Sequence, residues 1–174
     1  QDGNSGQDVS PCSVLNKINA TFMTQQLGAA QFVTAFYAVF DTRTRRLTYC
    51  NAGHVAQMVV QNPSASPTPD NLLEMPSQGL VLGMFATTFL SDASIDLGPE
   101  ARLFLFTDGI TEAHGTNGKM FGVEPLKELA LGSGSEHPAA LIDSLMRLRS
   151  EYLGGSTQAT GELADDATLV ILDV

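Results

Sequence analysis

Hydrophobic residues recur at helical spacing near the start of the chain. Ser10 and Pro11 are favourable at a helix start, with serine as the N-cap and proline in the first helical position. The apolar positions that follow lie on one face of such a helix: Val14, Leu15, Ile18 and Phe22. This pattern predicts an amphipathic helix over residues 10–26, preceded by a polar, flexible lead-in over residues 1–9.

Apolar segments rich in β-branched and aromatic residues predict strands. Residues 32–40 (FVTAFYAVF) are apolar on both faces, which favours a central strand covered on both sides. A polar turn containing arginines connects this segment to residues 47–51, so the two are expected to form a β-hairpin. Further strands are expected, in chain order, at residues 55–60, 87–97, 102–107 and 167–174.

The order of the elements indicates the fold class. Two more amphipathic helices are expected at residues 122–131 and 138–153, and surface loops at residues 62–70 and 154–164. Strands come first, helices are inserted late, and a strand closes the chain. This order predicts an α+β fold with mostly antiparallel sheets.

Composition narrows the class of protein. The chain has 174 residues, which suits one domain, and 43% hydrophobic against 16% charged residues, which argues against disorder. Nine Lys and Arg residues stand against 19 Asp and Glu residues, for a formal charge of −10. Nucleic acids and anionic membranes need a basic surface, so neither is an expected partner. The acidic balance permits divalent-cation binding.

The cysteines and the apolar segments indicate the cellular compartment that we expect for the protein. Cys12 and Cys50 have neither metal-ligand spacing nor the pattern of a disulfide framework. The chain shows no secretory leader and no apolar run of about 18 residues, the length that a membrane-spanning helix needs. We therefore expect a reduced, cytoplasmic protein without a membrane-spanning segment.

Two aspartates lie at the ends of predicted strands. Asp108 follows the strand at residues 102–107 and precedes Gly109, whereas Asp165 stands beside Asp166 before the last strand. Carboxylates held by rigid strand ends could together bind a hard divalent cation. Asp-Gly after a strand is also an ordinary turn, and Asp-Asp before a strand is equally common. Spacing alone leaves both interpretations open.

The ordered set of segments points further. It consists of FVTAFYAVFD (32–41), LTYCNAGH (47–54), GLVLGMF (79–85), LFLFTDGITEA (103–113), FG (121–122) and DDATLVIL (165–172). Over residues 10–174 the chain resembles the SpoIIE-like (RsbU-like) branch of the PPM metal-dependent serine/threonine protein phosphatases. The resemblance implies an α/β/β/α layered sandwich of two mostly antiparallel sheets flanked by helices.

The same resemblance implies a reaction and its residues. The family has two Mn²⁺ or Mg²⁺ ions, and a metal-activated water hydrolyses phosphoserine or phosphothreonine. Asp108 and Asp165 match its metal-ligand, and hence catalytic, aspartates. Asp166 and Gly109 are expected to support these ligands through hydrogen bonds. No base role follows for His54 of the NAGH segment, for which packing in the turn is favoured.

The family also implies partners. Its members typically act on a phosphorylated anti-sigma-factor antagonist, a STAS-like protein, under the control of an attached or associated sensory or receiver domain. The competing hypothesis is a catalytically inactive pseudophosphatase that binds a regulatory partner. An α+β domain without a site is a third, blander possibility.

One family motif does not match. The family opens with Gly-Asp-Val-x-Gly-His-Gly, whose aspartate bridges both metals, whereas here Asp8-Val9-Ser10 leads into Pro11-Cys12. The domain is therefore expected to lack its opening strands and one bridging carboxylate, and this chain alone is expected to be weakly active or inactive. Truncation, an unrecorded leading segment and a natural remnant all explain this. The remnant is least favourable because it leaves sheet edges and apolar faces exposed.

Overall fold

The computed structural model describes residues 10–25, 31–154 and 166–174. The expected lead-in at residues 1–9 and the predicted ligand Asp165 lie outside these residues. The chain forms two compact units, each built from two separate stretches of sequence. The first unit contains residues 1–54 and 76–96, and the second contains residues 55–75 and 97–174.

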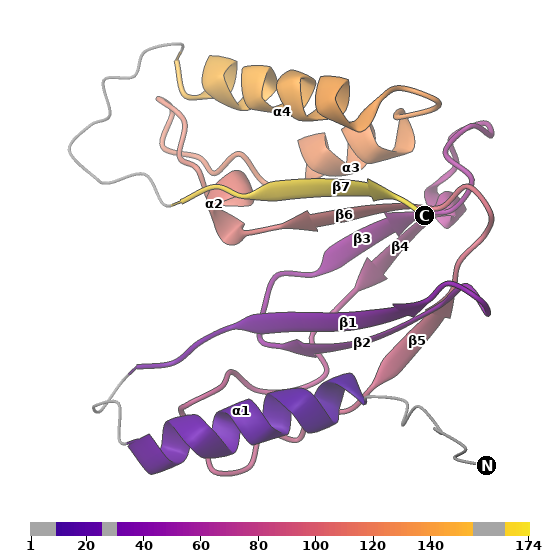
Figure 1. Ribbon diagram of the computed structural model, residues 1–174. Helices are drawn as coiled ribbons and strands as arrows, with labels where there is room; N and C mark the ends of the chain where they lie inside the picture. Colours follow the sequence, from indigo (N-terminus) through magenta and orange to yellow (C-terminus); the bar gives the residue numbers. More distant parts are fainter. Residues whose placement is uncertain (1–9, 26–30, 155–165) are drawn as a thin grey trace. The chain divides into compact units, whose positions relative to one another are not determined.

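The first unit is a helix packed on an antiparallel sheet (Figure 1). The described residues form three strands in the order β1 (Ala35–Asp41), β2 (Arg46–Ala52) and β5 (Ala93–Asp96). Helix α1 (Pro11–Gln25) packs against β1 and β2. A small apolar core lies between them: Leu15, Cys50, Ala52 and Leu82.

Helix α1 begins where the Ser10–Pro11 signal predicts, but the first turn is also hydrogen-bonded to a residue far away in the sequence. The carboxylate of Asp92 accepts hydrogen bonds from the Cys12 amide (2.7 Å) and the Ser10 hydroxyl (2.6 Å). Amides in the first helical turn have no partner within the helix, so Asp92 supplies one from another segment. The start of α1 is thereby connected to the residues that precede β5.

The hairpin between β1 and β2 is confirmed, and Asp41 shapes its turn. The Asp41 carboxylate accepts hydrogen bonds from the amides of Arg43 (2.8 Å) and Thr44 (3.2 Å). The Thr44 side chain and these two amides lower the pKa of Asp41, because hydrogen bonds to a carboxylate favour its charged form. Arg45 adopts a φ of 56°, which closes the turn into β2.

Two strand predictions in this unit are wrong in part. Within the described chain, β1 pairs along its length with β2 alone and is an edge strand rather than a central one. It starts at Ala35, and Phe32 and Val33 before it are exposed. The strand expected at residues 87–97 shrinks to β5. Phe89 has a φ of 53°, which an extended strand cannot contain.

The second unit has a four-stranded antiparallel sheet in its described residues. The order is β4 (Leu72–Met75), β3 (Gln57–Val60), β6 (Arg102–Phe106) and β7 (Leu169–Asp173). All four residues of β3 are buried, as suits a strand paired on both sides. Strand β4 was not predicted, because its four residues (LLEM) lack alternation. A 3-10 turn, η1 (Pro69–Asn71), leads into it.

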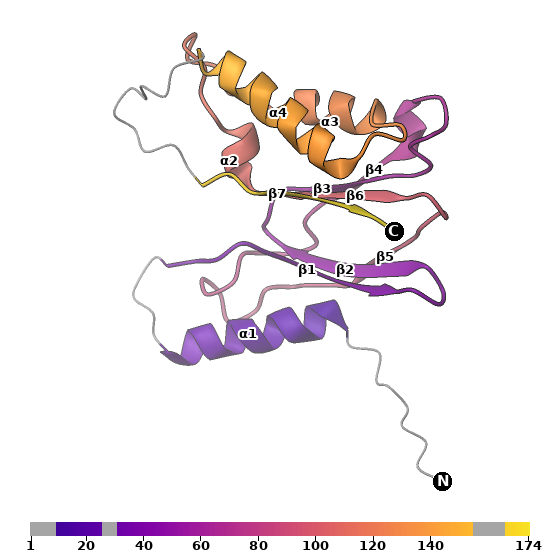
Figure 2. The same ribbon diagram turned by 45° about the horizontal axis from the view of Figure 1, so that its top comes forward.

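Helices α3 (Glu124–Leu131) and α4 (Pro138–Tyr152) lie on one face of this sheet (Figure 2). A four-residue helix, α2 (Asp108–Thr111), directly follows β6 and is too short to show a helical pattern in the sequence. The core between helices and sheet includes Met58, Phe104, Leu126, Leu141 and Leu145. The predicted fold class, α+β with two antiparallel sheets flanked by helices, is confirmed. None of the helices in the described chain is long and apolar enough to span a membrane.

Candidate active site at the end of β6

The end of strand β6 is fixed by hydrogen bonds on both of its sides. On its β3 side, the buried amide of Gln57 pairs with both backbone groups of Phe106. The Phe106 amide donates to Gln57 Oε1 (2.6 Å), and Gln57 Nε2 donates to the Phe106 carbonyl (3.1 Å). A side chain here replaces the backbone partner that a longer β3 would provide. Since buried polar groups need partners, this arrangement restricts the strand end immediately before Asp108.

On the β7 side, Thr107 connects β6 to the segment that leads into β7. The Thr107 amide donates to the Thr168 carbonyl (3.1 Å), and the Thr168 amide donates to Thr107 Oγ1 (2.9 Å). The Thr107 hydroxyl in turn donates to the carbonyl of Asp166 (3.1 Å). The backbone of Asp166 and Thr168 therefore lies beside the end of β6.

Asp108 opens α2 directly after this strand end and is half-buried. Its Oδ1 accepts a hydrogen bond from the amide of Gly109 (3.0 Å). Its carbonyl accepts from the Glu112 amide (2.7 Å) and the Thr111 hydroxyl (3.2 Å). The carboxylate is thus carried by a junction whose backbone is bonded on both the strand and the helix side.

Helix α4 supports the same junction. Arg149 Nη2 donates to the carbonyl of Gly109 (3.2 Å), the residue after Asp108. None of the sequence motifs predicts a role for Arg149, Gln57 or Thr107. The threonine stands within the TDG motif, which was a signal, whereas Gln57 and Arg149 had none, because their partners are distant backbone groups.

The predicted ligands fit divalent-cation chemistry in part. Carboxylate oxygens are the donors that Mg²⁺ and Mn²⁺ prefer, and Asp108 supplies one from a rigid position. Within residues 10–25, 31–154 and 166–174, no three or more His, Cys, Asp or Glu side chains form a group that could hold a metal ion. The proximity of Asp108 to Asp165 stays a prediction.

Comparison with models of protein families identifies the family to which these motifs belong. Residues 4–174 match the family model described as Stage II sporulation protein E (SpoIIE). The chain belongs to the SpoIIE family. The match covers the β6 end and both aspartate segments, so the residues that carried the resemblance lie in the family's own domain.

Two curated proteins are similar along nearly the whole chain. The phosphoserine phosphatase RsbU of Bacillus subtilis is 27% identical over 169 residues, which cover 94% of this chain and 45% of RsbU. Protein IcfG of Synechocystis sp. is 26% identical over 172 residues, which cover 97% of this chain and 25% of IcfG. The chain therefore spans less than half the length of either relative.

Solved structures show the same fold. The SiaA-PP2C domain of Pseudomonas aeruginosa aligns with a TM-score of 0.75 at 17% identity, over 95% of this chain and 61% of that domain. The SpoIIE phosphatase domain of Bacillus subtilis aligns with a TM-score of 0.61 at 14% identity, over 97% of this chain and 68% of that domain. This SpoIIE-family chain therefore has the fold of the PP2C-type phosphatase domains.

The NAGH segment of this SpoIIE-family chain lies in the first unit and forms a bonded turn. The His54 amide donates to Asn51 Oδ1 (2.8 Å), and His54 Nδ1 lies 3.1 Å from the Thr34 hydroxyl. Gly53 has a φ of 69°, and a Cβ at this position would lie 2.5 Å from the side chain of Val81. Only glycine fits both constraints. The contacts of His54 are those of a residue packed in the turn.

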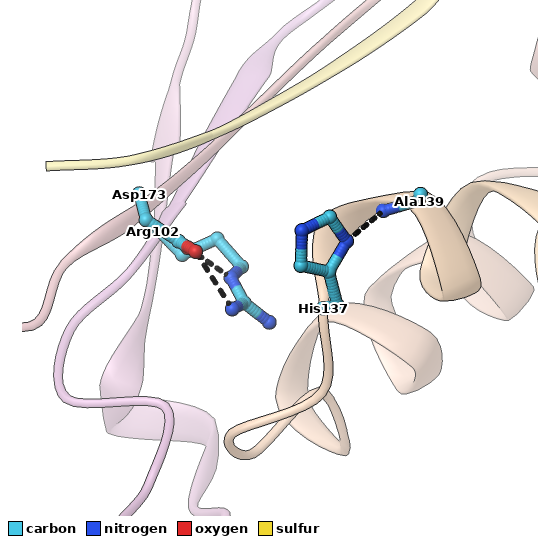
Figure 3. A network of polar contacts seen from close by, with 4 residues as sticks. All are labelled: Arg102, His137, Ala139 and Asp173. Atoms are coloured by element: carbon cyan, nitrogen blue, oxygen red, sulfur yellow. Dashed lines mark hydrogen bonds and ion pairs between the residues drawn. The ribbon is translucent and has the colours of Figure 1, made fainter.

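A second polar cluster lies at the other end of the β6–β7 pair. Arg102, 4% exposed, donates through Nε (2.5 Å) and Nη2 (3.1 Å) to the carboxylate of Asp173 (Figure 3). Glu100 and Asp173 line the open pocket beside it, so two carboxylates accompany the one guanidinium. His137 accepts a hydrogen bond from the Ala139 amide (3.2 Å) and caps α4 (Figure 3). This charge balance does not suit a phosphate group.

Proposed function

We propose that the intact protein is a metal-dependent serine/threonine protein phosphatase. It hydrolyses phosphoserine or phosphothreonine on a regulatory protein of the anti-sigma-factor antagonist type by means of a metal-activated water. The observation that carries the proposal is the junction at the end of β6. In this SpoIIE-family chain, Asp108 directly follows Thr107 at the end of β6, and Thr107 is hydrogen-bonded to the backbone of Asp166 and Thr168.

Asp108 and Asp165 are the proposed ligands for Mn²⁺ or Mg²⁺, of which the family site holds two. When bound, such ions activate water and neutralise charge on the phosphoryl oxygens. Two solved relatives support this choice by their descriptions. The SpoIIE phosphatase domain was presoaked with Mn, and RsbX was solved in complex with magnesium. Gly109 and Asp166 are the proposed supporting residues for these ligands. The backbone N–H of Gly109 donates a hydrogen bond to Asp108 Oδ1.

The chain's own residues would position the ligands rather than react. The hydrogen bonds of Gln57 and Thr107 hold the strand end, and Arg149 holds the turn after it. Catalysis of phosphoryl transfer depends mainly on positioning and on charge neutralisation, so no side-chain nucleophile is required. Rigid support of Asp108 is the contribution that the described residues can make.

The partners belong to the same proposal. A phosphorylated STAS-like anti-sigma-factor antagonist is the proposed substrate, and an attached or associated sensory or receiver domain is the proposed regulator. A relative named as a phosphoserine phosphatase supports the reaction. A Mycobacterium tuberculosis protein with RsbU and RsbW domains supports the regulatory context, with a TM-score of 0.64 at 22% identity. We place the phosphatase domain at residues 10–174 and its action in the cytoplasm.

An inactive partner-binding module is the second candidate. The described residues contain no metal-binding group of three or more side chains, which is the observation that favours it. Such a module would bind the phosphorylated partner but would release no phosphate.

Phosphate release distinguishes the two candidates. The intact protein is incubated with a phosphoserine-containing STAS-like protein in EDTA, and MnCl₂ or MgCl₂ is then added in excess. We expect no release in EDTA and release after either metal is added. Robust release in EDTA would contradict the metal-dependent mechanism. Binding of the partner without release under any metal condition would establish the inactive module.

A further inference from the structure

The two cysteines of the first unit lie against the same small core. Cys50 on β2 is fully buried, in a cluster whose other members are Leu15, Ala52 and Leu82. Cys12, in the first turn of α1, is partly exposed and packs against this cluster. Both thiols are free in the structure. The fold therefore brings together two cysteines whose spacing in the sequence indicates no pair.

Asp92 lies next to both cysteines. The regular pairing of β2 with β5 ends at Tyr49 and Ala93. The next residues in the same register are Cys50 and Asp92, and side chains of opposite residues lie on the same face of a sheet. The Asp92 carboxylate in turn accepts a hydrogen bond from the Cys12 amide (2.7 Å), where the start of α1 meets the start of β5 (Figure 1). One carboxylate is therefore a neighbour of Cys50 and bonded to the backbone of Cys12.

The side chain of Cys12 lies near the same carboxylate. Cys12 Sγ is 3.5 Å from the Ser10 hydroxyl, and that hydroxyl donates to Asp92 Oδ2 (2.6 Å). The pKa of Cys50 agrees with this arrangement. Burial raises it to about 11, and the charges of Cys12 and Asp92 add to the increase. Because the interaction of two charges falls with distance, the effect of Cys12 also indicates that the two thiols are near neighbours.

We propose that Cys12 and Cys50 form a reversible disulfide that links the first turn of α1 to β2. The oxidant is a small-molecule disulfide of the glutathione type. The Cys12 thiolate attacks one sulfur of oxidised glutathione, so that a mixed disulfide forms and one glutathione thiolate leaves. The Cys50 thiolate then attacks the Cys12 sulfur, and the second glutathione thiolate leaves. The two leaving thiolates take up the two protons that the cysteines release, and glutathione gains the two electrons that the cysteines lose.

Exposure and the pKa of Cys50 set the order of the two steps. Cys50 is 0% exposed and cannot meet the oxidant directly, whereas Cys12 is partly exposed. Attack requires a thiolate, and the raised pKa of Cys50 keeps its thiolate scarce at neutral pH. We therefore expect the mixed disulfide on Cys12 to form first and the closing step to be slower.

The disulfide would add a covalent link where hydrogen bonds to Asp92 otherwise hold the start of α1. Disulfides stabilise a fold mainly by restricting the unfolded chain. Oxidation should therefore raise the urea concentration at which the protein unfolds, and reduction should reverse this change.

The test incubates the intact, natively folded protein in buffers with increasing ratios of oxidised to reduced glutathione. Free thiols are blocked by alkylation, and the peptides are mapped by mass spectrometry without reductant. We expect a cross-linked peptide pair that contains Cys12 and Cys50 and disappears after dithiothreitol. Cys50→Ala should stop at the glutathione adduct of Cys12. Cys12→Ala should leave Cys50 unmodified, and neither variant should gain resistance to urea on oxidation.

Two results would overturn the proposal. Wild-type protein that carries glutathione on Cys12, or no modification at all, without a cross-link to Cys50 shows that the two thiols do not meet in the folded state. A cross-link that forms only in urea shows that the pair belongs to the unfolded chain. If Cys50→Ala does not fold, Cys12→Ala remains the control, because it changes a partly exposed position and keeps the buried thiol.

Discussion

At the scale of single residues, burial determines how strongly a polar group depends on its partner for stability. Arg102 is almost fully buried, and its ion pair with Asp173 joins the first residue of β6 to the last residue of β7. Asp173 itself is half-exposed, so water weakens its side of the pair. The main effect of Asp173 is to provide a counter-ion for a guanidinium that has left water.

Removing that counter-ion should destabilise the second unit. We expect Asp173→Asn to lower the free energy of unfolding by about 1–3 kcal/mol, less than the loss of a partner from a fully buried pair, because Asp173 is half-exposed. Urea denaturation of the variant and the wild type measures the difference. Asp143→Asn, the same substitution at an exposed position of α4, is the control and should change little. Equal stability of the Asp173 variant and the control would contradict this role.

Cys50 gives a prediction on pH. Burial, followed by the nearby Cys12 and Asp92, raises the pKa of the Cys50 thiol from 9.0 to about 11. A raised pKa means that the folded protein holds this proton more tightly than the unfolded chain. The resulting stability is complete below pH 9 and is lost as the pH rises toward 11.

The comparison with Cys50→Ala isolates this effect. Tyr49 and Lys127 also have raised pKa values, but they are present in both proteins and cancel in the difference. We expect the stability advantage of the wild type over Cys50→Ala to shrink between pH 9 and pH 11, as measured by urea denaturation at each pH. An advantage that stays constant across this range would show that the thiol titrates alike in both states.

At the scale of elements, local sequence signals were reliable where the element makes its own contacts. The Ser10 hydroxyl also caps α1 locally, by accepting a hydrogen bond from the Ser13 amide (3.2 Å), and the hairpin turn at Asp41 is local as well; both were predicted. The position of β1 in its sheet was not, because edge and central strands differ in their neighbours rather than in their own composition. The strand predicted at residues 87–97 was too long, because nothing in the sequence reveals the positive φ of Phe89.

The distant cap on α1 allows a test at this scale. Asp92→Ala removes the acceptor for the Cys12 amide and the Ser10 hydroxyl. Loss of a helix cap typically costs about 0.5–2 kcal/mol, and we expect a decrease in unfolding free energy within this range. Asp92→Asn keeps one acceptor oxygen and should lose less. Chemical denaturation followed by circular dichroism measures both variants, and a wild-type value for Asp92→Ala would contradict the cap.

At the scale of the whole molecule, the sequence predicted the family and the position of Asp108, whose role as a metal ligand stays a prediction. Asp108 lies at the end of β6 as expected from its place after an apolar run. Gln57 and Arg149 could not be found from patterns, because each bonds to backbone groups far away in the sequence. Thr107 stands in the TDG motif, but its bond to Asp166 could not be inferred from that motif. Asp165 lies outside the described residues, so its part in the site stays a prediction.

The most direct test of the central claim is phosphate release by the Asp108→Asn variant of the intact protein. Asparagine keeps the shape of the side chain and removes the charge that a divalent cation requires. With a phosphoserine-containing STAS-like substrate and saturating Mn²⁺, we expect wild type and the Asp143→Asn control to release phosphate. The Asp108→Asn protein should release none while unfolding at the wild-type temperature in metal-free buffer. Wild-type turnover by Asp108→Asn would contradict the account.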